Sequence, residues 1–111
     1  MKLETWENKV LANYLDGVRL IQIPASRKKR LVILRWLVRK FEADLIYQES
    51  QVNDIISIHH SDYATLRREL ISYQFMEREN NLYWRNPASL WKSEHEIMQR
   101  KIDKSINHKT L

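Results

Sequence analysis

The sequence predicts a mainly α-helical domain with one small β-hairpin. Its 111 residues include one glycine and two prolines, which favours helices with short connections over a sandwich or barrel with many turns. Apolar residues recur every three or four positions through most of the chain, which is the spacing of one helix face. Near residue 80, two short strand-like runs surround an Asn-Asn pair, and asparagine tolerates the positive φ of a tight hairpin turn.

The N-terminal segment is predicted to form an amphipathic helix over residues 5–16. Thr5 can cap its start, and Gly17 can supply a left-handed stop. One apolar face consists of Trp6, Val10, Leu11 and Tyr14. Residues 18–23 are interpreted as a short strand or an extended connection, and Pro24 prevents any helix from continuing through it.

A second helix is predicted over residues 27–42, with Ser26 as its cap. Apolar residues surround its middle turns and predict a largely buried helix: Leu31, Val32, Ile33, Leu34, Trp36, Leu37, Val38 and Phe41. Its first turn is entirely basic, from Arg27 to Arg30. Cations there oppose the helix dipole, so the run favours an anionic partner, although a solvated charged end is the ordinary alternative.

Two further helices are predicted over residues 49–59 and 62–74, after an extended piece at 44–47. The inward residues are expected to be Val52, Ile55, Ile56, His59, Tyr63, Leu66, Leu70 and Tyr73. Ser61 is expected to cap the later helix. Strands over 75–78 and 82–85 form the hairpin, and a last helix over 88–105 begins after Pro87.

The order of helix, short strand, helix, turn, helix and hairpin is that of a winged helix-turn-helix. We therefore divide the chain into an N-terminal amphipathic helix and connection (1–23), a winged-helix domain (24–86), and a C-terminal amphipathic helix and tail (87–111).

The predicted helix over residues 62–74 has the composition of a recognition helix. Its outward face is small, polar and basic, and we expect base or nearby phosphate contacts from Thr65, Arg67, Arg68 and Ser72. Backbone phosphates are expected to contact Lys28, Lys29, Arg30, Arg78 and Arg85. An ordinary solvated helix shows the same residue types. Arg67 lies between the two faces, within reach of a phosphate or of an acid on a neighbouring helix.

Three stretches of this sequence resemble a bacterial domain family of unknown function. They are IPASRKKRL at 23–31, DYATLRREL at 62–70 and YWR at 83–85, and the resemblance covers about 23–85. The family is often joined to helix-turn-helix regulators and also occurs alone, which implies a role in transcription regulation. In joined members another domain reads the DNA, so the resemblance equally allows a sensing or protein-binding role. This chain shows no second helix-turn-helix, so we expect any DNA binding to fall to this domain.

The chain departs from that family's pattern at two places. Where the family has Tyr-Thr-Glu, this chain has Tyr47-Gln48-Glu49, and the loss of the threonine weakens a helix cap. Where the family has a glycine before the final strand, this chain has Asn81, which changes the hairpin turn. Neither change is expected to prevent the fold.

Composition excludes several other classes of function. The net charge is +5, the chain contains no cysteine, and its lone glycine rules out a glycine-rich phosphate loop. His59, His60 and Asp62 suggest a metal site, but adjacent histidines usually point apart, so we expect no metal and no cofactor. Glu69 is expected to pair with Arg67 or Arg68 rather than to act as a catalytic acid, and we predict no enzyme activity. The absence of a signal-peptide pattern or an apolar run of membrane length predicts a cytoplasmic protein.

The flanking helices predict self-association. Their apolar seams resemble coiled-coil contacts, and the expected dimer interface is Trp6, Val10, Tyr14, Trp91, His95, Met98 and Ile102. The alternative is that both helices cover their own domain. The sequence thus predicts a homodimeric transcription regulator that binds double-stranded DNA, with another regulatory protein as a further candidate partner. The alternative function is a protein-interaction adaptor that does not bind DNA.

Overall fold

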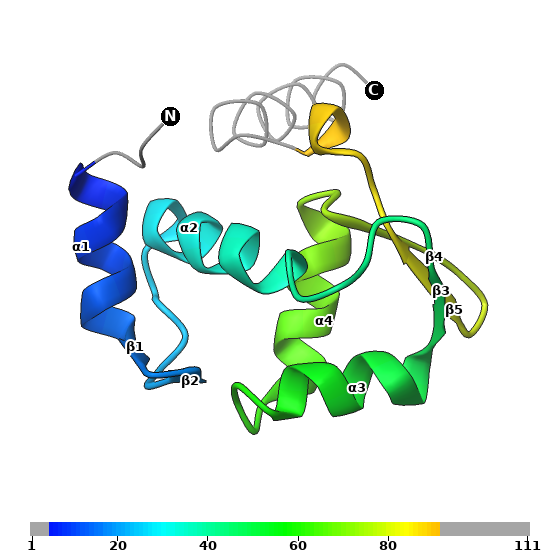
Figure 1. The fold of residues 1–111 in the computed structure, drawn as a ribbon, viewed down its shortest axis with the longest axis horizontal. Coiled ribbons are helices and arrows are strands. Elements are labelled where there is room, and N and C mark those ends of the chain that lie inside the picture. Colours follow the sequence, from blue (N-terminus) through cyan, green and yellow to red (C-terminus); the bar gives the residue numbers. More distant parts are fainter. Residues whose placement is uncertain (1–4, 92–111) are drawn as a thin grey trace, which may run out of the picture.

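The computed structural model describes residues 5–91, and their helices and strands form a helical body with two small antiparallel sheets (Figure 1). In chain order the elements are α1 Thr5–Tyr14, β1 Leu15–Asp16, β2 Arg19–Leu20, α2 Arg27–Val38, β3 Ile46–Gln48, α3 Glu49–Ser57, α4 Tyr63–Ser72, β4 Met76–Glu79, β5 Leu82–Arg85 and the 3₁₀ turn η1 Ala88–Leu90. One sheet contains β1 and β2, and the other has the order β3-β5-β4. Among the described residues, no helix is long and apolar enough to cross a membrane.

Helix α2 forms the centre of the core, with α1 on one side and α4 on the other (Figure 1). Six of its twelve residues are buried, so the prediction of a helix covered on most sides is confirmed: Leu31, Val32, Ile33, Leu34, Leu37 and Val38. The Ser26 hydroxyl accepts a hydrogen bond from the Lys29 N–H, as expected of its cap. The helix ends at Val38, four residues earlier than predicted, although Phe41 beyond it remains buried.

Helix α1 ends at Tyr14 rather than at Asp16, because the next two residues pair with a strand. Leu15 and Asp16 lie opposite Leu20 and Arg19, around Gly17 with a φ of +63°. The Val10 side chain is buried, so this part of the predicted interface packs inside its own chain.

The β1-β2 hairpin is anchored to the end of α3. The Leu20 N–H donates to the His59 carbonyl at 2.8 Å, and Arg19 donates to the Ser57 and Ile58 carbonyls. The His59 ring lies inward as predicted, with Nδ1 2.6 Å from the Val18 carbonyl and its ring edge-on to Trp36.

The start of α4 corrects two predictions. Asp62, not Ser61, caps the helix, because its carboxylate accepts a hydrogen bond from the Thr65 N–H at 3.3 Å. The backbone N–H of Asp62 is in turn bound by His60 Nδ1 at 2.9 Å. Tyr63, at the first position of α4, is 39% exposed rather than inward.

The hairpin forms with its second strand as predicted and its first strand one residue later, at Met76–Glu79, and its positive φ is at Asn80 (+55°). The φ of Asn81 is not positive, so the turn does not need a glycine at this position. The Asn81 carbonyl instead accepts the Glu49 N–H, which joins the turn to the start of α3. The Gln48 N–H donates to Gln51 Oε1 at 2.8 Å, so this half of a capping box forms although glutamine replaces the threonine at the cap.

The last predicted helix begins differently from expectation. Residues Ala88–Leu90 form a single 3₁₀ turn and Trp91 is extended, so no α-helix begins at residue 88. The Trp91 ring packs edge-on against Phe75, and its Nε1 donates to the Asn86 carbonyl. The rest of this predicted helix lies outside the described residues.

Candidate nucleic-acid interface

The outward face of α4 carries the side chains that the sequence singled out for base contact. Arg68 and Ser72 are exposed and Thr65 is half-buried, whereas Leu66 and Leu70 on the opposite side are fully buried. The two faces follow from the helical repeat, because residues three and four apart lie on one side. The predicted sorting of this helix into core and surface faces therefore holds, apart from Tyr63.

Helix α4 and the hairpin enclose a hollow of about 240 Å³. It is lined by Arg67, Arg68, Ile71 and Ser72 from the helix and by Arg78 and Tyr83 from the hairpin. Three guanidinium groups thus come together around one concave surface, although they are separated by up to eleven positions in the chain. Such a concentration of cations attracts anions, and a guanidinium binds a phosphate through two parallel hydrogen bonds.

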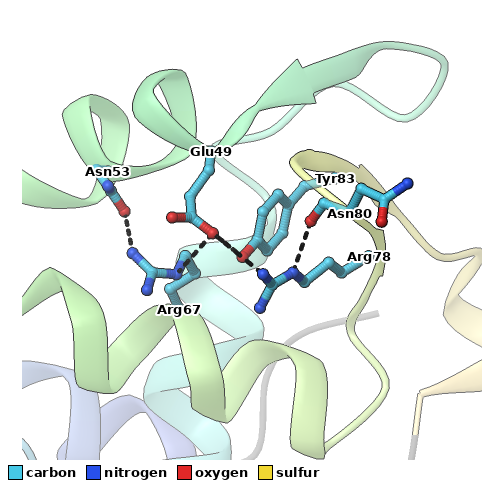
Figure 2. Close-up of polar contacts among 6 residues, drawn as sticks. All are labelled: Glu49, Asn53, Arg67, Arg78, Asn80 and Tyr83. Atoms are coloured by element: carbon cyan, nitrogen blue, oxygen red, sulfur yellow. Dashed lines mark hydrogen bonds and ion pairs between the residues drawn. The ribbon is translucent and has the colours of Figure 1, made fainter.

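Glu49 joins the two sides of this hollow (Figure 2). Its Oε1 atom accepts a hydrogen bond of 2.6 Å from the Tyr83 hydroxyl. The same oxygen lies 3.9 Å from Arg67 Nε and 3.8 Å from Arg78 Nη2. One carboxylate in the first turn of α3 therefore contacts α4, β4 and β5 together.

Each of the two arginines has a second partner that sets its orientation (Figure 2). Arg67 Nη1 donates to the Asn53 side-chain oxygen at 2.5 Å, and Arg78 Nε donates to the Asn80 carbonyl at 2.8 Å. The Arg67 side chain is only 16% exposed, whereas that of Arg78 is 50% exposed. Arg67 thus forms the wall of the hollow, and Arg78 is the more accessible of the two.

The hydrogen bond between Glu49 and Tyr83 and the burial of Tyr83 shift two pKa values. The hydrogen bond from Tyr83 is the largest cause that lowers the pKa of Glu49, followed by the charges of Arg67 and Arg78. Burial, and then the neighbouring Glu49 carboxylate, raise the pKa of the Tyr83 phenol. Glu49 is consequently ionised at neutral pH and balances one of the three guanidinium charges.

Arg68 differs from its neighbours because no hydrogen bond or ion pair engages its guanidinium within residues 5–91. Its charge contributes to the lowered pKa of Asp62, although hydrogen bonds from Thr65 are the larger cause. Among the arginines of this hollow, Arg68 therefore has the most donors available for a ligand.

The basic start of α2 separates into exposed and engaged residues. Lys28 and Lys29 are exposed, and the Lys28 ammonium lies 4.7 Å from the centre of the Trp6 ring. Arg30 is held within the fold: its Nε lies 2.7 Å from Glu69 on α4, and Nη1 donates to the Pro24 and Ala25 carbonyls. Glu69 therefore pairs with Arg30 rather than with Arg67 or Arg68. We therefore assign Arg30 a structural role, in holding α2 against α4, and do not count it among the residues that contact phosphates.

Arg85 lies at the base of the hairpin and not beside its turn. It is opposite Met76 in the strand register, and its Nη1 donates to the Phe41 carbonyl at 3.0 Å. Its guanidinium also faces the Trp91 ring at 5.5 Å. These contacts connect the sheet to the loop after α2 and give Arg85 a packing role.

The predicted dimer seam is only partly within the described residues. Trp6 is 38% exposed and Tyr14 is half-buried, whereas Trp91 packs on Phe75 of its own chain. His95, Met98 and Ile102 lie outside the described residues. Self-association through this seam stays a prediction.

Sequence reasoning missed Glu49, Asn53 and Tyr83 as members of this site. An acidic residue such as Glu49 is common in the first turn of a helix, so its presence does not indicate a contact with Tyr83, 34 residues later. Tyr83 lies opposite Arg78 in the hairpin, but strand alternation alone could not show this, because the register between β4 and β5 was not known from the sequence. No sequence signal indicates Asn53.

The chain matches the sequence profile of a known family over most of the described residues. The sequence profile of a family described as an uncharacterized protein conserved in bacteria (DUF2087) matches residues 19–85, which include the hollow and every element from β2 to β5. No curated protein and no solved structure matches the chain.

Proposed function

The chain belongs to this family of uncharacterized proteins conserved in bacteria, and we propose that it acts as a DNA-binding transcription regulator. The observation that carries the proposal is the basic hollow between α4 and the hairpin, with Arg68 exposed at its edge. The arrangement of elements supports it: the order α2-β3-α3-α4-β4-β5, with β3 added to the hairpin, is the one expected of a winged helix.

In this proposal the outward face of α4 enters the major groove. Thr65 and Ser72 are short enough to let the helix approach, and Arg68 has free donors for the O6 and N7 atoms of a guanine. Arg78 contacts a backbone phosphate next to the groove, and Lys28 and Lys29 contact phosphates further along. Arg67 holds the wall of the hollow through Glu49 and Asn53, so its role is to position the helix against the hairpin.

A binding comparison of Arg68→Ala with wild type tests the role of this residue. A site is first selected from random duplexes with the wild-type protein, and affinities for that site and for random DNA are then measured. We expect Arg68→Ala to weaken binding to the selected site about tenfold or more, with a much smaller effect on random DNA.

Arg39→Ala is the matched control, because Arg39 is another exposed arginine and its guanidinium lies 5.4 Å from the Trp91 ring, outside the hollow. It is expected to leave both affinities near the wild-type values. An equal loss on both DNAs for Arg68→Ala would assign it to phosphate contact instead of base reading. No loss on either DNA would remove Arg68 from the interface.

A further inference from the structure

The sheet β3-β5-β4 has a second face that the basic hollow does not use. Side chains alternate along a strand, and the strand register places Ile46, Trp84 and Glu77 side by side, with Gln48, Leu82 and Glu79 in the next row. The intervening Tyr47 and Tyr83 are buried in the core. We call these six outward positions the outer sheet face: Ile46, Gln48, Glu77, Glu79, Leu82 and Trp84.

Three of the six positions on the outer sheet face are apolar: Ile46, Leu82 and Trp84. Ile46 is 65% exposed and Leu82 44%, and Leu45, just before β3, is 45% exposed. Beside them, Ala43, Asp44, Leu45, Ile46 and Trp84 line a hollow of about 330 Å³. Exposed apolar side chains beside a hollow with a half-buried tryptophan are typical of a protein-binding surface.

The charge around this face is opposite to that of the whole chain. The chain has a net charge of +5, yet none of the six outward positions is basic and two are glutamates. Glu42 and Asp44 add two exposed acids in the loop before β3. Acids there repel phosphates, so this side of the hairpin does not suit DNA. They also repel a second copy of the same face, whereas a basic partner is attracted.

The position of β3 indicates the form of the partner. Within the described residues β3 pairs only with β5 and is an outer strand of its sheet, so one edge of β3 has no neighbouring strand. On that edge the Gln48 N–H already donates to Gln51 Oε1, which leaves Ile46 as the residue whose backbone a further strand can pair with. An extended peptide can add to such an edge through main-chain hydrogen bonds and place alternate side chains into adjoining hollows.

We propose that the outer sheet face binds an extended basic peptide segment of a partner protein. The segment pairs with the backbone of Ile46 at the free edge of β3, and one bulky apolar side chain enters the hollow beside Trp84. Flanking lysines or arginines face Asp44, Glu77 and Glu79. This surface is independent of the proposed DNA contacts, because no residue of one belongs to the other.

The test uses the full chain, labelled with ¹⁵N, and short synthetic peptides in which two residue types alternate. Lys–Val is the probe, Glu–Val tests the charge requirement, and Lys–Ser tests the apolar requirement. We expect the Lys–Val peptide alone to bind, and to shift the amide signals of Leu45, Ile46 and Leu82. Equal binding of either control peptide, or no binding of any peptide, would overturn the proposal.

Variants locate the site. We expect a loss of about tenfold in affinity for the Lys–Val peptide from Ile46→Ser, and the same loss from the double variant Glu77→Gln with Glu79→Gln. Ile58→Ser is the matched control, since Ile58 is 57% exposed but lies beyond the end of α3, and it should have no effect. Ile46 and Glu79 are exposed, whereas Glu77 is half-buried and accepts a hydrogen bond from the Asn86 side chain, an acceptor that glutamine retains. Each variant is checked for folding by its amide spectrum, and Leu45→Ser replaces any that fails. Concentration-dependent dimerisation abolished by Ile46→Ser would overturn the proposal in favour of a second copy, as would DNA binding that depends on Ile46.

Discussion

Glu49 is the residue on which the candidate interface depends most. Its carboxylate accepts the Tyr83 hydroxyl and lies within 4 Å of two arginines, and these partners come from three different elements. The ion pairs at 3.8 and 3.9 Å are long, whereas the hydrogen bond to Tyr83 is short. We infer that Tyr83 holds the carboxylate in place and that the carboxylate in turn orients the arginines.

The pKa shifts of this pair predict a two-sided pH dependence of stability. The pKa of Glu49 is lowered from 4.5, so its stabilising contribution is present above that pH and is lost as the pH falls through the lower folded value. The pKa of Tyr83 is raised from 10.0, so its contribution is present below pH 10 and is lost as the pH rises through the higher folded value. When the free energy of unfolding is measured with urea across this pH range, Tyr83→Phe should show a smaller loss of stability than wild type at both the acidic and the basic end. If the variant keeps the wild-type slope below pH 4.5, the hydrogen bond does not cause the lowered pKa.

Arg30 gives a prediction about stability rather than binding. Its side chain is 22% exposed and that of Glu69 is 25% exposed, and Arg30 also donates to two backbone carbonyls. Arg30→Ala leaves these acceptors without a partner, and we expect the free energy of unfolding to fall by about 1–3 kcal/mol. Urea titration followed by circular dichroism measures this loss. Wild-type stability together with strongly reduced DNA affinity would return Arg30 to the phosphate contacts.

At the scale of elements, the start of α4 depends on its cap. The Asp62 carboxylate accepts the Thr65 N–H, whereas Ser61 precedes the cap position. Asp62→Ala is therefore expected to lower Tm by roughly 5 °C, and Ser61→Ala to leave it nearly unchanged. Differential scanning calorimetry compares the two variants. A larger loss from Ser61→Ala would mean that the serine caps the helix in solution.

The sequence predicted helices more successfully than it predicted their ends and partners. The apolar spacing of α2, α3 and α4 located all three, because burial of one face repeats along the helix itself. The β1-β2 hairpin was missed as a unit, since two-residue strands have no periodicity and Leu20 of this pair is anchored by His59, 39 residues later. For the candidate site too, features within one helix were predictable and contacts between distant segments were not. Arg68 and Ser72 were found from helix geometry, whereas the contact of Glu49 with Tyr83 depends on how β3 and the hairpin pair.

At the scale of the whole molecule, charge is divided between two surfaces. The hollow between α4 and the hairpin contains three arginines, and the outer sheet face contains two glutamates and no basic residue. The hairpin contributes to both, because alternation turns Arg78 to one side of the sheet and Glu77 and Glu79 to the other. A net charge of +5 therefore understates how basic one side of the molecule is.

The most direct measurement is a fluorescence-polarisation titration of the full chain with random-sequence duplex DNA at roughly 50 and 200 mM salt. Contacts from Lys28, Lys29 and Arg78 predict binding at the lower salt, with log K falling against log salt at a slope of about −3 for each bound chain. No binding at the lower salt by a protein shown to be folded would contradict DNA binding and leave the protein-interaction function in its place.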